Sequence, residues 1–262
     1  MRYAIMRRVS PGMGNCELTF VGRTAIDLSR ADEQHRRIGQ MLEAEGLTVI
    51  TLPADGSLPD STFTEDTAII LDEVAVITNP GAASRRRETA VIAELLSRFR
   101  PLRWIKGEGT GEGTGEGTIE GGDVVRIDRT LYVGIDTRTN AAGLASLASQ
   151  VEPFGYAVIP VPTTNCLHLK TCATYLGDET WLTNPAWFDG ANLKNFRILT
   201  VPADEPWAAN TLSLNGKVYL PAGNPRTSEL LEREGYRVAT IEMDELQKAE
   251  AGLTCVSLIF DA

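Results

Sequence analysis

The sequence predicts an α/β protein in which one module, made of a hairpin, a helix and a strand, recurs along the chain. Three observations predict this class: helical stretches that end at a glycine before a short apolar run, paired apolar runs joined by polar turns, and an ordinary globular composition. The 262 residues are 43% hydrophobic and 23% charged, which excludes a wholly disordered chain. A chain of this length buries a core without disulfides, and it fits either one large domain or two small ones.

Three copies of the helix–glycine–strand pattern are regular. Their helices end at Gly46, Gly155 and Gly235. Glycine is favoured there because it adopts the left-handed conformation that ends many helices. Short strands are expected directly afterwards, up to Pro53, Pro162 and Ile241. A fourth, less regular copy runs from a helix over 91–99 to a strand over 102–105.

Paired apolar runs between the helices predict hairpins. The pair with the strongest turn signal flanks Asn215-Gly216, a dipeptide typical of two-residue hairpin turns. Two further pairs flank polar turns, so that the expected hairpins cover residues 68–77, 124–133 and 211–220. No such module buries its own apolar face, and repetition therefore favours a closed arrangement of modules. A doubly wound open sheet is the alternative.

Charge and targeting signals narrow the range of partners. The chain carries 25 Lys+Arg against 35 Asp+Glu, a net charge of −10, which disfavours nucleic acid and anionic membranes as partners. No window approaches the ~18 apolar residues of a membrane span, and the N-terminus lacks the apolar region of a secretory signal. We expect a cytoplasmic protein with four reduced cysteines, and two histidines supply a zinc site poorly.

Residues 107–118 consist of three tandem GEGT repeats. Alternating glycine and mutually repelling glutamate predict a flexible surface loop. No Lys-Ser/Thr follows the glycines, so a phosphate-binding loop is excluded. The repeat is either a harmless lengthening of a loop or a lid, because it leads directly into Glu120.

Two histidines and one cysteine are considered for catalysis. His35 lies in a charged helical stretch and is expected to face solvent, which leaves His168 as the candidate proton shuttle. A histidine between leucines is also often a plain core residue whose ring nitrogens are hydrogen-bonded. Cys255 follows the small residues Gly252 and Thr254 at an expected strand start, which suits an exposed thiolate. A buried structural cysteine is the alternative.

Two acidic clusters and two arginine sites suggest a substrate with a guanidinium and a carboxylate. Carboxylates at 60–66 and 120–123 precede apolar runs and suit a planar cation. Arg85 and Arg138 each follow an expected strand at the start of a helix and suit a carboxylate clamp. Capping carboxylates and surface arginines are the plainer alternatives.

Seven motifs occur in an order that resembles one known family: FTEDTA, NPGAASRRRE, TIEGGD, TRTN, HLKT, PAGNPRT and GLTC. The chain resembles the dimethylarginine dimethylaminohydrolases of the pentein, or guanidine-modifying, superfamily. The resemblance extends from Cys16 to the C-terminus and implies a single catalytic domain over residues 1–262. It implies a five-bladed α/β propeller of ββαβ modules with pseudo-fivefold symmetry around a central channel, in agreement with the repeated module.

The resemblance also implies roles for individual residues. Cys255 would be the nucleophile, His168 the acid and base, and Glu120 the carboxylate beside the guanidinium. The implied substrate-binding residues are Asp66 for the guanidinium nitrogens, Asp60 with the main-chain carbonyls of Leu18 and Ala249 for the α-ammonium, Arg85 and Arg138 for the α-carboxylate, and Glu65 and Phe63 for the pocket wall.

The implied reaction is hydrolysis of Nω-methylated arginines, namely asymmetric dimethylarginine and monomethylarginine, to citrulline and dimethylamine or methylamine. It would proceed through a covalent thiouronium on the cysteine. No metal or organic cofactor is expected, the partner is the small-molecule methylarginine, and a homodimer is compatible with the sequence.

The sequence departs from the familiar pattern in the GEGT repeat, in Ala251 where a glycine is common, and in Ala249. Three rival functions stay open. An arginine deiminase is disfavoured by the absence of an inserted helical domain, and an amidinotransferase would need an acceptor amine. A non-catalytic pentein binding module is disfavoured because the chain keeps the implied catalytic residues.

Overall fold

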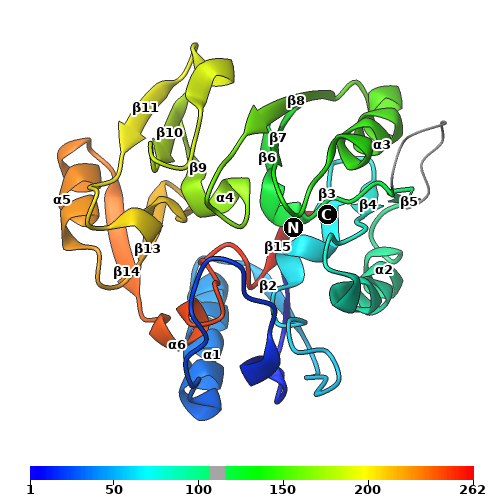
Figure 1. The fold of residues 1–262 in the computed structure, drawn as a ribbon, viewed down its shortest axis with the longest axis horizontal. Coiled ribbons are helices and arrows are strands. Elements are labelled where there is room, and N and C mark those ends of the chain that lie inside the picture. The colour runs from blue at the N-terminus through cyan, green and yellow to red at the C-terminus, as the bar shows by residue number, and fades with distance from the viewer. Residues whose placement is uncertain (107–115) are drawn as a thin grey trace.

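A computed structural model describes residues 1–106 and 116–262, and in these ranges five three-stranded sheets are arranged around a centre (Figure 1). In each sheet the first two strands pair antiparallel and the third runs parallel to the middle strand. We call each sheet with its connecting segment a module. Because a parallel partner needs a crossover, each third strand follows a connection that leaves the sheet.

The first two modules have the predicted hairpin, helix and strand. Module 1 comprises β3 (Ala68–Ile70), β4 (Ala75–Ile77), α2 (Thr89–Leu96) and β5 (Leu102–Trp104). Module 2 comprises β6 (Val124–Ile127), β7 (Thr130–Ile135), α3 (Ala141–Val151) and β8 (Ala157–Pro162).

Modules 3 and 4 differ in their crossovers. Module 3 comprises β9 (Ala173–Gly177), β10 (Thr180–Thr183) and β11 (Arg197–Thr200), with only the short 3-10 turn Gly190–Leu193 in its connection. Module 4 comprises β12 (Leu212–Leu214), β13 (Lys217–Pro221), α5 (Pro225–Arg233) and β14 (Arg237–Ile241). Module 3 is not predicted from the sequence because its crossover lacks the helix that marks the other modules.

Module 5 joins the two ends of the chain. Its strands are β15 (Leu258–Asp261), β1 (Arg2–Arg7) and β2 (Thr48–Leu52), and its helix is α1 (Leu28–Ala44). The termini lie side by side near the centre of the view in Figure 1, where the Met1 amine donates to the carbonyl of Ala262 at 2.8 Å. The C-terminal strand therefore starts the module that the N-terminal segment completes.

Apolar packing closes the ring. Five buried clusters lie between consecutive modules, and each takes side chains from both neighbours. Ile69 packs with Val124 between modules 1 and 2, and the cluster of Ile5 and Ile77 joins module 5 to module 1. The closed arrangement predicted from the repeat is confirmed, and the open-sheet alternative is wrong.

The predicted turn chemistry is also found. Gly46, Gly155 and Gly235 have positive φ values of 87°, 77° and 90°, as expected after a helix. Asn215 and Gly216 are both left-handed, with φ of 51° and 70°, as a two-residue hairpin turn requires.

The expectation that His35 faces solvent is wrong. His35 is 4% exposed and lies on the buried face of α1 with Ala31, Ile38 and Leu42. The spacing of four and three residues from Ala31 and Ile38 places it on that face, whereas its charged neighbours point outward. Burial lowers the pKa of His35 to about 4.

Two further expectations concern the surface. The GEGT loop predicted over 107–118 falls mostly on 107–115, which lie outside the described residues. Among the helices that the structure describes, none combines the length and the apolar character needed to cross a bilayer.

Candidate active site

Four side chains of the candidate site come from equivalent places in the fold. Asp66, Glu120, His168 and Cys255 each lie in the segment that precedes the first strand of a module, before β3, β6, β9 and β15 respectively. Asp66, His168 and Cys255 line one small pocket, and Glu120 is buried in hydrogen-bond contact with His168. The repeated module therefore delivers one functional group per blade to a common centre.

The shortest contact among these four side chains joins His168 and Glu120. Nε2 of His168 lies 2.6 Å from Oε2 of Glu120, and both side chains are buried. Burial alone lowers the pKa of His168, but the carboxylates of Asp66, Glu120 and Asp123 outweigh it and raise the pKa to about 10. His168 is therefore a cation at neutral pH and is available as a general acid.

Glycines allow the histidine to approach the acidic segment. A Cβ on Gly122 would lie 2.7 Å from Nδ1 of His168 and 2.8 Å from Oδ1 of Asp66. A Cβ on Gly121 would lie 2.0 Å from the carbonyl oxygen of Glu65. Any other residue in this pair of positions would push the carboxylate and imidazole segments apart, which explains the two glycines after Glu120.

Asp66 is ionised, and both of its carboxylate oxygens accept hydrogen bonds. Its Oδ2 accepts from Nη1 of Arg85 at 2.7 Å, and its Oδ1 accepts from the amide of Gly122 at 3.0 Å. Burial raises the pKa of Asp66, but the cations of His168 and Arg85 hold it at about 2. The carboxylate is thus charged and points at the imidazole, whose Nε2 is 3.8 Å from Oδ1.

Arg85 lies inside the pocket wall instead of on the surface. Its guanidinium also bonds Glu88, at 3.0 Å from Nη2 to Oε2, and the carbonyl of Phe63 at 3.1 Å. Only 3% of Arg85 is exposed. The plain alternative of a surface arginine is therefore excluded, and a carboxylate clamp at this position would require Arg85 to change partners.

The end of the pocket assigned to the amino-acid part of the substrate is formed by Asp60 and Arg138. Asp60 accepts from the amide of Glu17 at 3.1 and 3.2 Å. Nη1 of Arg138 is 3.6 Å from Oε1 of Glu120 and has no hydrogen-bond partner within the described residues. Because a buried guanidinium with an unused donor favours an anion, Arg138 suits a substrate carboxylate.

Cys255 is buried, which differs from the exposed thiolate considered above. It is 8% exposed and lies in a turn three residues before β15, where its Sγ accepts from the amide of Gly252 at 3.3 Å. Burial raises the pKa of this thiol, and the carboxylates of Glu65 and Asp66 raise it further. Without a bound cation, Cys255 therefore remains a neutral thiol at neutral pH.

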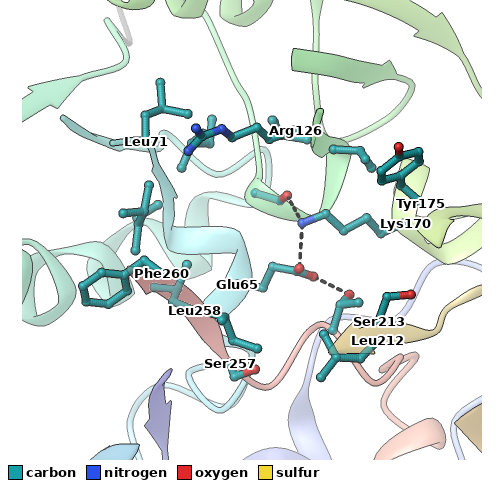
Figure 2. Close-up of a pocket in the computed structure, with 18 of the residues that line it drawn as sticks. Glu65, Leu71, Arg126, Lys170, Tyr175, Leu212, Ser213, Ser257, Leu258 and Phe260 are labelled. Carbon is teal, nitrogen blue, oxygen red and sulfur yellow. Dashed lines mark hydrogen bonds and ion pairs between the residues drawn. The ribbon is translucent and has the colours of Figure 1, made fainter. Parts of the chain in front are cut away.

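A hydrogen-bonded cluster closes the inner end of the site (Figure 2). Lys170 donates to Oε1 of Glu65 at 2.7 Å and to the carbonyl of Gly121 at 3.1 Å, and Thr254 donates to Oε2 of Glu65 at 2.7 Å. We call Glu65, Lys170, Gly121 and Thr254 the floor cluster. Behind it lies a cavity of about 520 Å³ lined by strands of several modules, among them residues Leu71, Tyr175 and Phe260.

The floor cluster is tied to the pocket through the chain. Glu65, Gly121 and Thr254 are the immediate neighbours of Asp66, Glu120 and Cys255, and Lys170 follows His168 by two residues. The floor cluster lines the larger cavity, whereas Asp66, His168 and Cys255 of the same segments line the small pocket. Movement in the floor cluster would shift the pocket groups with it.

A metal could in geometric terms be held by Asp66, Glu120 and His168, whose ligand atoms lie within 4.8 Å of one another. The protonated state of His168 opposes this, because an imidazole must be neutral to bind a metal. The expectation of a metal-free site stays a prediction.

Several residues of the site were not singled out from the sequence. Lys170, Asn210, Glu250 and Thr254 make the contacts that shape it, and Asn210 bonds both the carbonyl of Lys170 at 2.8 Å and Thr254 at 3.1 Å. Asn210 precedes the first strand of module 4, so it is the fifth member of the series that includes Asp66 and Cys255. That repeated position is the one sequence signal that could have identified it.

One protein family and two curated proteins are similar to this chain over most of its length. A family model described as N,N dimethylarginine dimethylhydrolase, eukaryotic, matches residues 22–184. The chain is 36% identical over 236 residues to an N(G),N(G)-dimethylarginine dimethylaminohydrolase of Pseudomonas aeruginosa, covering 89% of this chain and 90% of that protein. It is 35% identical over 257 residues to the protein of the same name from Streptomyces coelicolor, covering 97% and 95%.

Solved structures give the same result. The fold superposes with a TM-score of 0.91 on a cysteine-to-serine mutant of the Pseudomonas aeruginosa enzyme complexed with citrulline, at 33% identity and 98% coverage of both chains. The N-terminal domain of a cyanobacterial arginine dihydrolase, at 19% identity and a TM-score of 0.84 with 98% and 97% coverage, shares the fold.

Proposed function

The chain belongs to the dimethylarginine dimethylaminohydrolase family of the pentein superfamily, and from that premise we propose that it hydrolyses Nω-methylated arginines to citrulline through a covalent adduct on Cys255. The family, the fold of five modules and the hydrolase class predicted from the sequence are confirmed by the two curated relatives and the solved structure. The roles of single residues are our proposals and are supported by the geometry of the pocket.

The pocket recognises the two ends of the substrate with opposite charges. Asp66 and Glu120 hold the guanidinium, since both carboxylates are ionised and buried beside His168. Asp60 accepts from the α-ammonium, and Arg138 donates to the α-carboxylate. The free space in the closed pocket is about 20 Å³, room for roughly one water molecule, so groups at its mouth must move to admit a substrate.

Substrate binding activates the thiol. In the free protein Glu65 and Asp66 oppose the charge of a Cys255 thiolate. A guanidinium placed against Asp66 adds a positive charge next to the sulfur, which lowers the pKa of the thiol and releases its proton to solvent. The nucleophile therefore forms mainly when its target is in place.

The chemistry then proceeds in two halves. The Cys255 thiolate forms a C–S bond to the guanidinium carbon, and the π electrons of the C=N bond move to nitrogen. His168 donates its proton to the dimethylamino nitrogen, the C–N bond breaks, and dimethylamine leaves a cationic S-alkylthiouronium.

Neutral His168 next removes a proton from water, and the hydroxide forms a C–O bond to the same carbon. The C–S bond breaks, its electrons return to sulfur, and the hydroxyl proton passes to solvent as citrulline forms. Glu120 stabilises the protonated imidazole in both halves, because it accepts the hydrogen bond of Nε2.

The single observation that carries this proposal is the convergence of Asp66, His168 and Cys255 in one pocket, with the buried Glu120 bonded to His168. The test is a citrulline assay of the purified protein with dimethylarginine, monomethylarginine and arginine in parallel, with a chelator present. Citrulline from the methylated substrates, with arginine poor, is the expected result. Arginine as the best substrate would instead assign the chain to deiminase activity.

A further inference from the structure

We propose that Glu250 is a positioning residue for recognition of the substrate α-ammonium, an inference that rests on the proposed function. Glu250 is 6% exposed and lies beside the pocket, next to Ala249. It has no role in the chemistry described above. Its carboxylate binds the loop that carries Leu18, and its backbone directly follows Ala249.

The carboxylate of Glu250 holds the loop at the mouth of the pocket. It accepts from three successive amides: that of Thr19 at 2.7 Å, that of Phe20 at 2.5 Å and that of Val21 at 3.1 Å. Such a concave run of amides is a natural site for an anion, and a carboxylate in it is strongly bound. The loop of residues 17–21 is therefore fixed to the segment that carries Ala249.

Leu18 is fixed from both sides by these contacts. The amide before it, of Glu17, donates to Asp60, and the amide after it, of Thr19, donates to Glu250. The carbonyl of Leu18 thus keeps a defined position relative to Asp60 and to Ala249. These are the three groups proposed to accept from the α-ammonium, whose three N–H donors they match in number.

The backbone of Glu250 is held in a strained conformation. Its φ of 59° lies in the left-handed region, which glutamate seldom adopts. Strain of this kind persists where surrounding contacts fix it, and it gathers at functional sites. Here the three hydrogen bonds from backbone amides fix the Glu250 side chain. The turn directs Ala249 toward the pocket and the Glu250 carboxylate toward the loop.

Two substrates distinguish a role of Glu250 in positioning the α-ammonium site from a general effect on the fold. Monomethylarginine carries the α-ammonium, whereas Nω-methyl-5-guanidinopentanoate keeps the carboxylate and the guanidinium but has hydrogen in its place. For Glu250→Ala we expect KM for monomethylarginine to rise about tenfold or more with kcat within about twofold. KM for the deamino substrate should stay unchanged, because the group that Glu250 serves is missing.

Glu250→Gln keeps one acceptor oxygen and should recover part of the loss. Glu245→Ala is the matched control. The Glu245 carboxylate is also buried and accepts from the amide of Asp27 at 2.8 Å, but it does not contact the loop around Leu18. This control should leave both KM values unchanged, and thermal denaturation of each variant checks that it is folded.

Equal loss on both substrates, or no loss on either, would overturn the role of Glu250. Binding of both compounds to the Cys255→Ser protein, with and without Glu250→Ala, gives the same comparison without turnover. Failure of the proposed function shows itself separately, as a wild-type protein that forms no citrulline. Selective weakening of monomethylarginine binding in that case would still support the positioning role.

Discussion

At the scale of single residues, the chemistry depends on which groups carry a proton at neutral pH. His168 is a cation because three carboxylates surround it, and Cys255 is a neutral thiol because burial and two carboxylates oppose its charge. In the proposed mechanism the free protein therefore holds the general acid, His168, in its charged form and the nucleophile, Cys255, in its protonated form. A cationic substrate is needed to lower the pKa of the Cys255 thiol.

Replacing Glu120 with glutamine tests the origin of the His168 charge. The change removes the bonded carboxylate, so the pKa of His168 should fall from about 10 toward its ordinary value. A titration followed by NMR of the two histidine rings measures it, with His35→Gln to assign the signals. We also expect kcat to fall roughly tenfold or more at alkaline pH, where the imidazole loses its proton. An unchanged His168 pKa would contradict this account.

The state of Cys255 predicts slow alkylation of the free protein. With the thiol pKa raised, the rate of reaction with iodoacetamide should keep rising with pH beyond neutrality and show no plateau near pH 7. Peptide mapping by mass spectrometry separates Cys255 from the other three cysteines. Asp66→Asn removes one opposing carboxylate and should speed the reaction. A rate that levels off below pH 7 would mean that the thiolate is preformed.

At the scale of elements, the segments that precede the first strands of the modules have two sides. One side carries the pocket groups, and the other carries the floor cluster of Glu65, Lys170, Gly121 and Thr254. The motifs in the sequence singled out Asp66, Glu120, His168 and Cys255 and located three of the four segments at strand starts. They did not reveal the floor cluster, because its bonds join segments up to 189 residues apart.

The floor cluster predicts a role for Lys170 in placing the catalytic groups. Lys170→Met breaks the bonds to Glu65 and Gly121, and a displacement of the neighbouring groups should lower kcat about tenfold to a hundredfold with a smaller effect on KM. Lys217→Met is the matched control, since Lys217 forms a similar pair with Glu45 at 2.7 Å outside the site. If both variants behave alike, the cluster has no special part in catalysis.

At the scale of the whole molecule, five modules close into a ring because both termini complete module 5 and five apolar clusters join the neighbours. The sequence predicted the helix and third strand of four modules and the hairpins of three of them. It could not predict module 3, which lacks a regular helix, or the burial of His35, which depends on how α1 packs. Local patterns do not contain such tertiary contacts.

Burial of His35 predicts that the fold loses stability in acid. Its pKa is about 4 in the folded protein and near 6.5 when unfolded, so between these values the unfolded chain binds more protons and stability falls as pH falls. The loss amounts to roughly 3 kcal/mol over that window. In urea unfolding between pH 7 and 4, His35→Leu should lose less stability than the wild type. Parallel curves for the two proteins would exclude His35 as the cause.

In the proposed mechanism Cys255 forms the covalent intermediate of a methylarginine hydrolase. An acid quench during turnover of dimethylarginine, followed by mass spectrometry of the intact protein and of the peptide that contains Cys255, detects that intermediate. A thiouronium adduct should form on Cys255, decay as citrulline appears and be absent from Cys255→Ser. Steady citrulline production by Cys255→Ser, or an adduct on another residue, would contradict it.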